Sequence, residues 1–108
     1  MTDKRLVLST AGSAEEAHKI ARHLVEQGLA ACVNIVPQIE SIYRWKGKVE
    51  SAREWLLVIK TTAEQFDSVR GAIQELHSYD LPECIALTIE DGSAEYLDWI
   101  GESVTSEQ

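Results

Sequence analysis

Residues 30–60 read AACVNIVPQIESIYRWKGKVESAREWLLVIK, and this stretch decides the fold. Residues 30–36, 39–45 and 54–60 are short runs rich in the β-branched, aliphatic and aromatic residues that are typical of strands. Gly47 lies in a turn signal between the last two of these segments. Pro37 has no N–H to donate to a strand ladder, so it marks a kink. The stretch therefore predicts one long β-hairpin that bends at the proline.

Helical periodicity flanks this hairpin on both sides. Residues 14–27 place apolar side chains on one face, after a capping box that joins Ser13 and Glu16. Residues 66–76 repeat that periodicity, after a second capping box at Thr62 and Gln65. A short third helix is expected after residue 93.

Two further strands are expected over residues 5–10 and 84–89. The chain then predicts an α+β fold in one domain, residues 1–108, with a ferredoxin-like βαββαβ core and an extra C-terminal helix. In this fold the four-stranded sheet is antiparallel, and both main helices lie on the same face.

The strand over residues 54–60 is apolar on both of its sides, since Leu56 and Val58 alternate with Leu57 and Ile59. An antiparallel sheet with one face in water would show polar residues on that face. We therefore expect the second face to be buried between copies of the chain in a closed ring. The residues expected at this subunit interface are Trp55, Leu56 and Val58.

The charge balance argues against two classes of partner. Ten Lys and Arg residues against 18 Asp and Glu residues give a formal net charge of −8. Bulk binding to nucleic acid or to an anionic membrane is not expected from such a chain. No 18-residue apolar stretch and no signal-peptide pattern occur, so we expect a cytoplasmic protein. Cys32 and Cys84 fit no CxxC motif and are expected to be free thiols.

The densest set of chemical groups lies in residues 77–84, HSYDLPEC. Imidazole and thiolate groups suit copper or zinc, and carboxylates complete such sites. An alternative is that His77 caps the C-terminal end of the second helix, while Cys84 packs as a small apolar residue. Tyr43 and Trp45 belong either to a ligand cleft or to subunit contacts. No motif of a catalytic triad, a phosphate loop or a zinc hydrolase occurs, so no catalytic residue is assigned.

Five segments stand out together: ACVNIVP at 31–37, SIYRWKG at 41–47, IKT at 59–61, HSYDLPE at 77–83 and YLDWI at 96–100. In this order and with this spacing they resemble the CutA family of divalent-cation-tolerance proteins. The resemblance implies a ferredoxin-like homotrimer, similar in architecture to PII signalling proteins, that acts in the response to divalent metals, notably copper. The family commonly has H-P-Y-E-x-P-E, where this chain has Ser78 and Asp80 in place of the proline and the first glutamate. Cys32 matches the family, whereas the position of Cys84 is usually aliphatic.

The resemblance and the donor groups together give one main hypothesis. The chain is expected to be a non-enzymatic homotrimer that holds a divalent metal ion, copper in the first place, in a cleft between subunits, with no organic cofactor. The expected metal ligands are His77, Glu83 and Cys32, and the expected cleft-lining residues are Tyr79, Tyr43, Trp45 and Lys60.

Two alternatives belong to other classes of protein. A PII-like signalling module would bind a small anionic ligand or a partner protein at the same cleft, through Lys60, Arg44 and Lys46. A small enzyme would use His77 and Glu83 as an acid–base pair.

Overall fold

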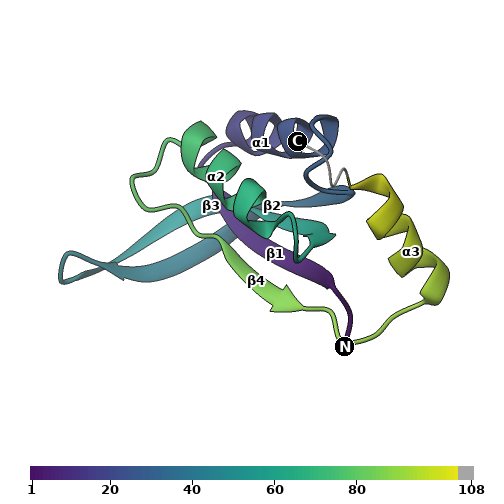
Figure 1. Ribbon diagram of the computed structural model, residues 1–108. Helices are drawn as coiled ribbons and strands as arrows, with labels where there is room; N and C mark the ends of the chain where they lie inside the picture. The colour runs from purple at the N-terminus through teal and green to yellow at the C-terminus, as the bar shows by residue number, and fades with distance from the viewer. Residues whose placement is uncertain (105–108) are drawn as a thin grey trace.

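The computed structural model describes residues 1–104, which form one four-stranded sheet with three helices (Figure 1). The elements in chain order are β1 (Lys4–Ala11), α1 (Ala14–Glu26), β2 (Cys32–Trp45), β3 (Lys48–Thr62), α2 (Phe66–Leu76), β4 (Ile85–Thr88) and α3 (Ala94–Ser103). The strand order is β2-β3-β1-β4, and every neighbouring pair is antiparallel. The predicted α+β, ferredoxin-like βαββαβ order with an extra C-terminal helix is confirmed.

The predicted start of α1 at Ser13 is confirmed, whereas α2 begins at Phe66 with Gln65 as its N-cap, three residues after the predicted cap Thr62. The Ser13 hydroxyl accepts a hydrogen bond of 3.1 Å from the N–H of Glu16, as an N-cap does. The Glu16 carboxylate, however, faces the N–H of Gly12 and the loop after α2, so the second half of this capping box is wrong. Before α2, the Thr62 hydroxyl accepts from the N–H of Gln65 at 3.3 Å.

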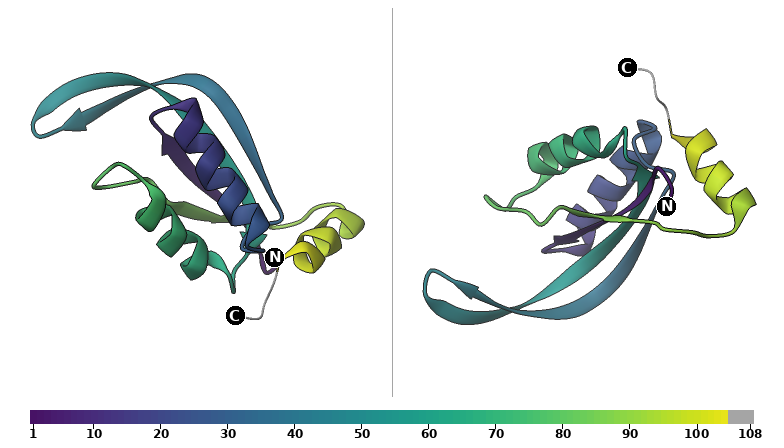
Figure 2. Two further views of the ribbon diagram at one scale, coloured as in Figure 1. Left: turned by 90° about the horizontal axis from the view of Figure 1, so that it is seen from above. Right: turned by 60° about the horizontal axis from the view of Figure 1, so that its bottom comes forward.

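The β2–β3 hairpin is the longest element and projects beyond the rest of the sheet (Figures 1 and 2). Lys46 (φ 52°) and Gly47 (φ 80°) both have positive φ, as a two-residue type I′ turn requires. Between Val36 and Ile39 the register shifts at a β-bulge, which confirms the kink predicted from Pro37. We call residues 39–54, which lie beyond the bulge, the arm.

The main hydrophobic core lies between one face of the sheet and helices α1 and α2. Its fully buried members are Val7, Ala11, Ala17, Ile20, Leu24, Leu57, Ile59, Val69 and Ile73. These residues come at helical spacing from α1 and α2 and at alternate positions from β1 and β3, so they all point inward. Leu57 and Ile59 therefore face the helices.

The other face of the sheet carries the side chains that alternate with this core. It presents Leu6, Leu8, Leu56, Val58, Val36, Ile85 and Leu87. Within residues 1–104 no helix covers this surface, which we call the open face (Figure 2). Val36, Ile85 and Leu87 are 40%, 52% and 46% exposed, so the open face is apolar and accessible.

One predicted interface residue lies on the wrong side for this surface. Trp55 pairs with Ala11 and packs against the main core, on the face that the helices cover. Trp55 is therefore not part of the open face with Leu56 and Val58, because successive strand residues point to opposite faces, and its place at a subunit interface stays a prediction.

The last strand is shorter than predicted, since Cys84 and Ile89 lie outside β4. Helix α3 then packs separately near the N-terminal end of β1 (Figure 1), where Ile100 and Val104 form a second small core with Ala31. None of the helices in residues 1–104 is long and apolar enough to span a membrane.

Candidate functional site

The imidazole of His77 is fully buried at the end of α2 and is engaged at both nitrogens. Its Nε2 lies 2.6 Å from the carbonyl oxygen of Thr10, and its Nδ1 accepts from the N–H of Tyr79 at 3.1 Å. These contacts place the ring proton on Nε2, which donates to Thr10. His77 is the C-terminal cap residue of α2, but its ring reaches across to β1 instead of the carbonyls of its own helix. A metal at His77 would have to displace one of these two contacts.

The carboxylate of Glu16 lies beside this imidazole, 3.7 Å from Nδ1. It accepts hydrogen bonds from the Ser78 N–H at 2.7 Å and from the Ser78 hydroxyl at 3.2 Å. Burial by itself would raise the pKa of Glu16, but the two hydrogen bonds from Ser78 and the nearby His77 outweigh it and lower this pKa below its ordinary value. Glu16 therefore ties the start of the loop at residues 77–84 to α1 as a carboxylate.

Tyr79 ties the same loop to the base of the arm. Its hydroxyl donates a 2.7 Å hydrogen bond to Glu54, and its ring centroid lies 4.5 Å from that of His77. Burial, followed by the hydrogen bond and the charge of Glu54, raises the pKa of Tyr79 well above the ordinary 10.0. Gly12 lies underneath, where a Cβ would come within 3.0 Å of the Tyr79 oxygen, so the close approach depends on a glycine.

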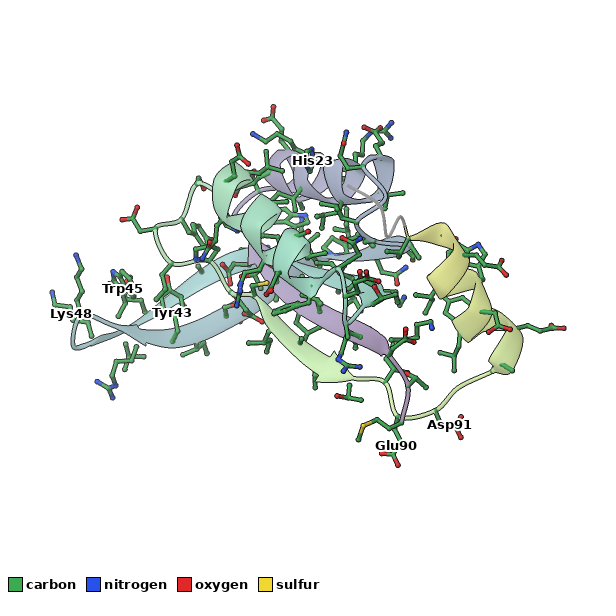
Figure 3. All side chains as sticks on the ribbon, in the orientation of Figure 1. His23, Tyr43, Trp45, Lys48, Glu90 and Asp91 are labelled. Carbon is green, nitrogen blue, oxygen red and sulfur yellow. The ribbon has the colours of Figure 1, made fainter. Side chains whose placement is uncertain are left out.

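The aromatic residues of the arm lie on the side of the arm that Glu54 shares. Glu54 pairs with Ile39, and the alternation that follows puts Tyr43 and Trp45 on the same side (Figure 3). They are 40% and 41% exposed. The Lys46 ammonium lies 5.9 Å from the Trp45 ring centroid, within cation–π range. The predicted cleft residues Tyr79, Tyr43 and Trp45 thus belong to one region around the arm.

Cys32 and Lys60 lie elsewhere, on the open face. The Lys60 ammonium is 4.0 Å from the Cys32 sulfur and donates a hydrogen bond to the side chain of Asn34, whose oxygen lies 3.8 Å from the same sulfur. We call Cys32, Asn34 and Lys60 the thiol cluster. Lys60 follows Glu54 by six positions on β3, a separation of about 20 Å at roughly 3.3 Å per residue. Within one chain, therefore, the structure does not bring Cys32 to His77.

Glu83 is exposed on the loop that leads into β4. Its backbone carbonyl accepts a 2.7 Å hydrogen bond from the Ser9 hydroxyl, which fixes the loop. Cys84 packs against the main core, and burial raises the pKa of its thiol. In the part of the chain that the structure describes, no group of three or more His, Cys, Asp and Glu side chains converges to hold a metal ion. The three predicted ligands thus form no ready site inside one subunit.

The sequence reasoning did not single out Glu54 or Asn34, and it assigned Glu16 only a capping role. A signal for Asn34 was present, because it stands two positions after Cys32 on a strand and so shares its face. No comparable local signal exists for Glu16 and Glu54. Their partners lie 62 and 25 residues away and are brought to them by the fold alone.

The fold and this loop define a ferredoxin-like α+β protein with a projecting two-stranded arm. The chain belongs to the CutA1 divalent ion tolerance protein family, which it matches over residues 5–103.

Relatives and solved structures agree with this assignment. The divalent-cation tolerance protein CutA of Thermus thermophilus is 49% identical over 100 residues, which are 93% of this chain and 97% of the relative. The solved structure of the Cut A1 protein from Thermus thermophilus superposes with a TM-score of 0.93 at 48% identity, covering 94% of this chain and 99% of that one. The CutA structure from Xylella fastidiosa gives a TM-score of 0.94 at 40% identity, covering 96% and 100%. The human protein CutA is 46% identical over 84 residues, 78% of this chain, and the match spans 47% of the human protein.

Proposed function

We propose that this chain forms a homotrimer that contributes to the tolerance of divalent metal ions without catalysing a reaction. The observation that carries the proposal is the open face, whose apolar side chains have no helix over them in residues 1–104. A surface of this kind is buried most readily by sister chains arranged in a closed ring. Leu56 and Val58 lie at the centre of this surface, on β3. A cytoplasmic location is part of the same proposal.

The metal site of this proposal lies between two subunits. Cys32 stands on β2 and Glu83 leads into β4, and these strands are the two opposite edges of the sheet. Three strand spacings of roughly 4.8 Å separate the edges, about 14 Å in all. A ring that brings the β2 edge of one subunit to the β4 edge of the next would combine Cys32 of one chain with Glu83 of another. The thiolate favours copper(I), and the carboxylate could complete the coordination of the same ion.

His77 would bind the metal ion only under one condition. Its Nδ1 could become the third ligand only if the Tyr79 N–H released it. Until then, His77 holds the loop that carries Glu83. Tyr79, Tyr43 and Trp45 would line the cleft on the side of the arm, and Lys60 would line it beside Cys32.

Copper titration of four proteins under native conditions tests the proposal. The proteins are the wild type, Cys32→Ser, Glu83→Gln and His77→Ala, each titrated with copper(I) and copper(II) by calorimetry and weighed as an intact assembly. We expect a trimer, a large loss of copper affinity in Cys32→Ser and a smaller loss in Glu83→Gln. Mixed trimers of Cys32→Ser and Glu83→Gln subunits should regain some sites, because intact donors then meet across an interface. A monomeric wild type, or equal copper affinity in all four proteins, would contradict the proposal.

A PII-like function has one observation in its favour. The Lys60 ammonium lies on the open face and makes no ion pair with a carboxylate among residues 1–104. Such a cation could receive a small anion in the same cleft. Arg44 and Lys46, the other cations named for this role, lie out on the arm, so the three charges do not converge within one chain. A thermal-shift screen of small anions separates the two functions, since a ligand of the folded state raises the melting temperature.

A further inference from the structure

Asp91 and Gly92 lie in the connection between β4 and α3 (Figure 3). Both are exposed, and neither belongs to a helix or a strand. The connection is anchored at each end: the N–H of Ile89 donates to the carbonyl oxygen of Lys4 at 3.2 Å, and Ser93 is the N-cap residue of α3. The peptide bond between Asp91 and Gly92 therefore lies in water, outside the regular backbone on either side of it.

The backbone N–H of Gly92 faces the side chain of the residue before it. It donates a 2.8 Å hydrogen bond to Oδ1 of Asp91, a local contact that aspartate side chains favour. The amide nitrogen of Gly92 is thereby held next to the carboxyl group of Asp91. A bond between this nitrogen and Cγ of Asp91 would close a five-membered ring, and groups held in contact in this way react far more readily than separate molecules.

Gly92 leaves the approach to its nitrogen sterically open. A glycine has no Cβ to hinder the attack, and its backbone rotates more easily than that of any other residue. Asp91 is the only aspartate of the sequence that precedes a glycine. The single asparagine, Asn34, precedes Ile35 inside β2. The combination of contact, exposure and open approach thus occurs at one peptide bond.

We propose that the Asp91–Gly92 peptide is a site of spontaneous isoaspartate formation. The Gly92 nitrogen attacks Cγ of Asp91, so that an N–Cγ bond forms and a C–O bond of the carboxyl group breaks. The departing oxygen takes the proton of the nitrogen and one proton from solvent, and leaves as water. A second water molecule opens the succinimide at either carbonyl carbon. One opening restores aspartate, and the other gives isoaspartate, in which the main chain runs through the former side chain.

Three other aspartates show what restrains this reaction elsewhere. Asp67 and Asp98 lie inside α2 and α3, where helical hydrogen bonds fix the backbone. Asp80 is exposed in a loop, as Asp91 is, but it precedes Leu81, whose side chain hinders the attack on Cγ. Asp80 therefore serves as an internal reference within the same chain.

Isoaspartate at this position would lengthen the tether of α3, because it adds one carbon atom to the main chain between β4 and α3. Helix α3 packs apart from the main core, through Ile100, Val104 and Ala31. An element held by so few buried contacts opens more easily than the rest of the fold. The amide hydrogens of α3 should therefore exchange faster in the isoaspartyl protein, while those of β1 and β3 keep their rates.

Ageing of four proteins tests the proposal. The wild type, Gly92→Ala, Asp91→Asn and Asp91→Glu are incubated together for several weeks in neutral buffer and then digested. Isoaspartate is located by electron-transfer dissociation mass spectrometry and quantified by methylation with an isoaspartyl methyltransferase and labelled S-adenosylmethionine. Gly92→Ala should fold normally, because Gly92 has no positive φ and an added Cβ would meet Leu97 at an ordinary 3.4 Å. Circular dichroism checks the fold of each variant.

We expect isoaspartate at Asp91 in the wild type, and at least about tenfold less at Asp80, because the following leucine hinders the ring closure. Gly92→Ala should accumulate isoaspartate at least about fivefold more slowly than the wild type, for the same steric reason. Asp91→Asn should react several times faster, since an amide loses ammonia more readily than a carboxylate loses oxygen. Asp91→Glu should form no ring product at this position, because its ring would have six members.

Three results would overturn the inference. The first is a wild type that holds no more isoaspartate at Asp91 than at Asp80. The second is a Gly92→Ala protein that ages as fast as the wild type, which would show that the glycine does not control the reaction. The third is an Asp91→Asn protein that stays unchanged, which would show that the folded connection cannot reach the ring geometry. None of these measurements depends on the number of subunits, so this inference is tested separately from the proposed homotrimer.

Discussion

The hydroxyl of Tyr79 donates a 2.7 Å hydrogen bond to the carboxylate of Glu54 at the point where the arm leaves the sheet. Glu54 is only 8% exposed and pairs with Ile39, the first residue of β2 beyond the bulge. The loop at residues 77–84 is thereby held against the base of the arm.

Replacing Tyr79 by Phe should destabilise the protein by about 1–3 kcal/mol, because a nearly buried carboxylate loses its donor. The measurement is urea unfolding at one fixed protein concentration. Tyr43→Phe is the matched control, since Tyr43 is 40% exposed, and its effect should stay within about 0.5 kcal/mol. Equal stability of the two variants would show that the Tyr79 hydroxyl contributes nothing to the fold.

The raised pKa of Tyr79 predicts a loss of stability in alkali. Up to pH 10 this hydroxyl is protonated in both the folded and the unfolded chain. Above its ordinary value of 10.0 the unfolded chain loses the proton first, so stability falls as the pH rises towards the raised folded pKa. Ultraviolet titration should show one tyrosine that ionises only when the protein unfolds, and Tyr79→Phe should remove that step. A wild type in which every tyrosine ionises near pH 10 before unfolding would contradict this prediction.

Glu16→Gln should lower the free energy of unfolding at neutral pH and make that free energy depend less on pH in acid. The lowered pKa of Glu16 means that its contribution is complete above the ordinary value of 4.5 and disappears as the pH falls through the folded pKa. At neutral pH we expect a loss of roughly 1–3 kcal/mol, the usual range for hydrogen bonds to a charged group. Glu15→Gln is the control, because Glu15 is exposed in the same first turn of α1. The measurement is urea unfolding of the wild type and both variants at pH 7 and near pH 3. A Glu16→Gln protein whose stability changes with pH as much as that of the wild type would refute the prediction.

Val58→Asp should break the assembly without unfolding the subunit. Val58 lies on the open face, where a carboxylate buried against sister chains would cost several kcal/mol. In a single chain the same side chain can reach water. Light scattering after size-exclusion chromatography should find smaller species than in the wild type. Val25→Asp, at an exposed position of α1, should leave the assembly intact, and a Val58→Asp trimer of wild-type strength would exclude the open face as the interface.

Two glycines should respond in opposite directions to substitution by alanine. Gly47 has φ +80° and no atom within 4 Å of an added Cβ, so Gly47→Ala meets only backbone strain, worth about 1–2 kcal/mol. Gly71 lies inside α2 with the same open space, and Gly71→Ala should stabilise by about 0.5–1 kcal/mol. Thermal unfolding of the two variants beside the wild type checks both signs.

The elements of this fold could be predicted because their signals are local. Runs of aliphatic, β-branched and aromatic residues defined the strands of the hairpin, helical spacing defined α1 and α2, and the Ser13 cap was visible from its neighbours. The predicted interface residues Trp55 and Leu56 lie on opposite faces of β3, since adjacent strand residues point to opposite sides. Strand β4 was overestimated because its apolar run continues past the last residue that pairs with β1.

The candidate site was harder to predict because its contacts are long-range. Donor atoms near one another in sequence suggested His77 as a ligand, but Thr10 and Tyr79 take both of its nitrogens. Ser78 shows the same limit. Its N–H donates to Glu16, and a proline, the residue that the resembled motif has at this position, could not make that bond. The departure from the motif at Ser78 therefore adds a hydrogen bond to the fold.

The bulge at Pro37 and Gln38 has a consequence for the whole arm. Before it, the even-numbered residues of β2 point to the open face; after it, the odd-numbered residues do, since Val36 pairs with Leu56 and Ile39 with Glu54. If all residues were kept and the ladder ran on from Val36 without the bulge, Tyr43 and Trp45 would turn to the reverse side, with Ile42 and Arg44 in their place. One backbone irregularity thus decides which side chains the arm shows in each direction, and a relative that lacks one residue at this point shows the same side only if its ladder is regular there.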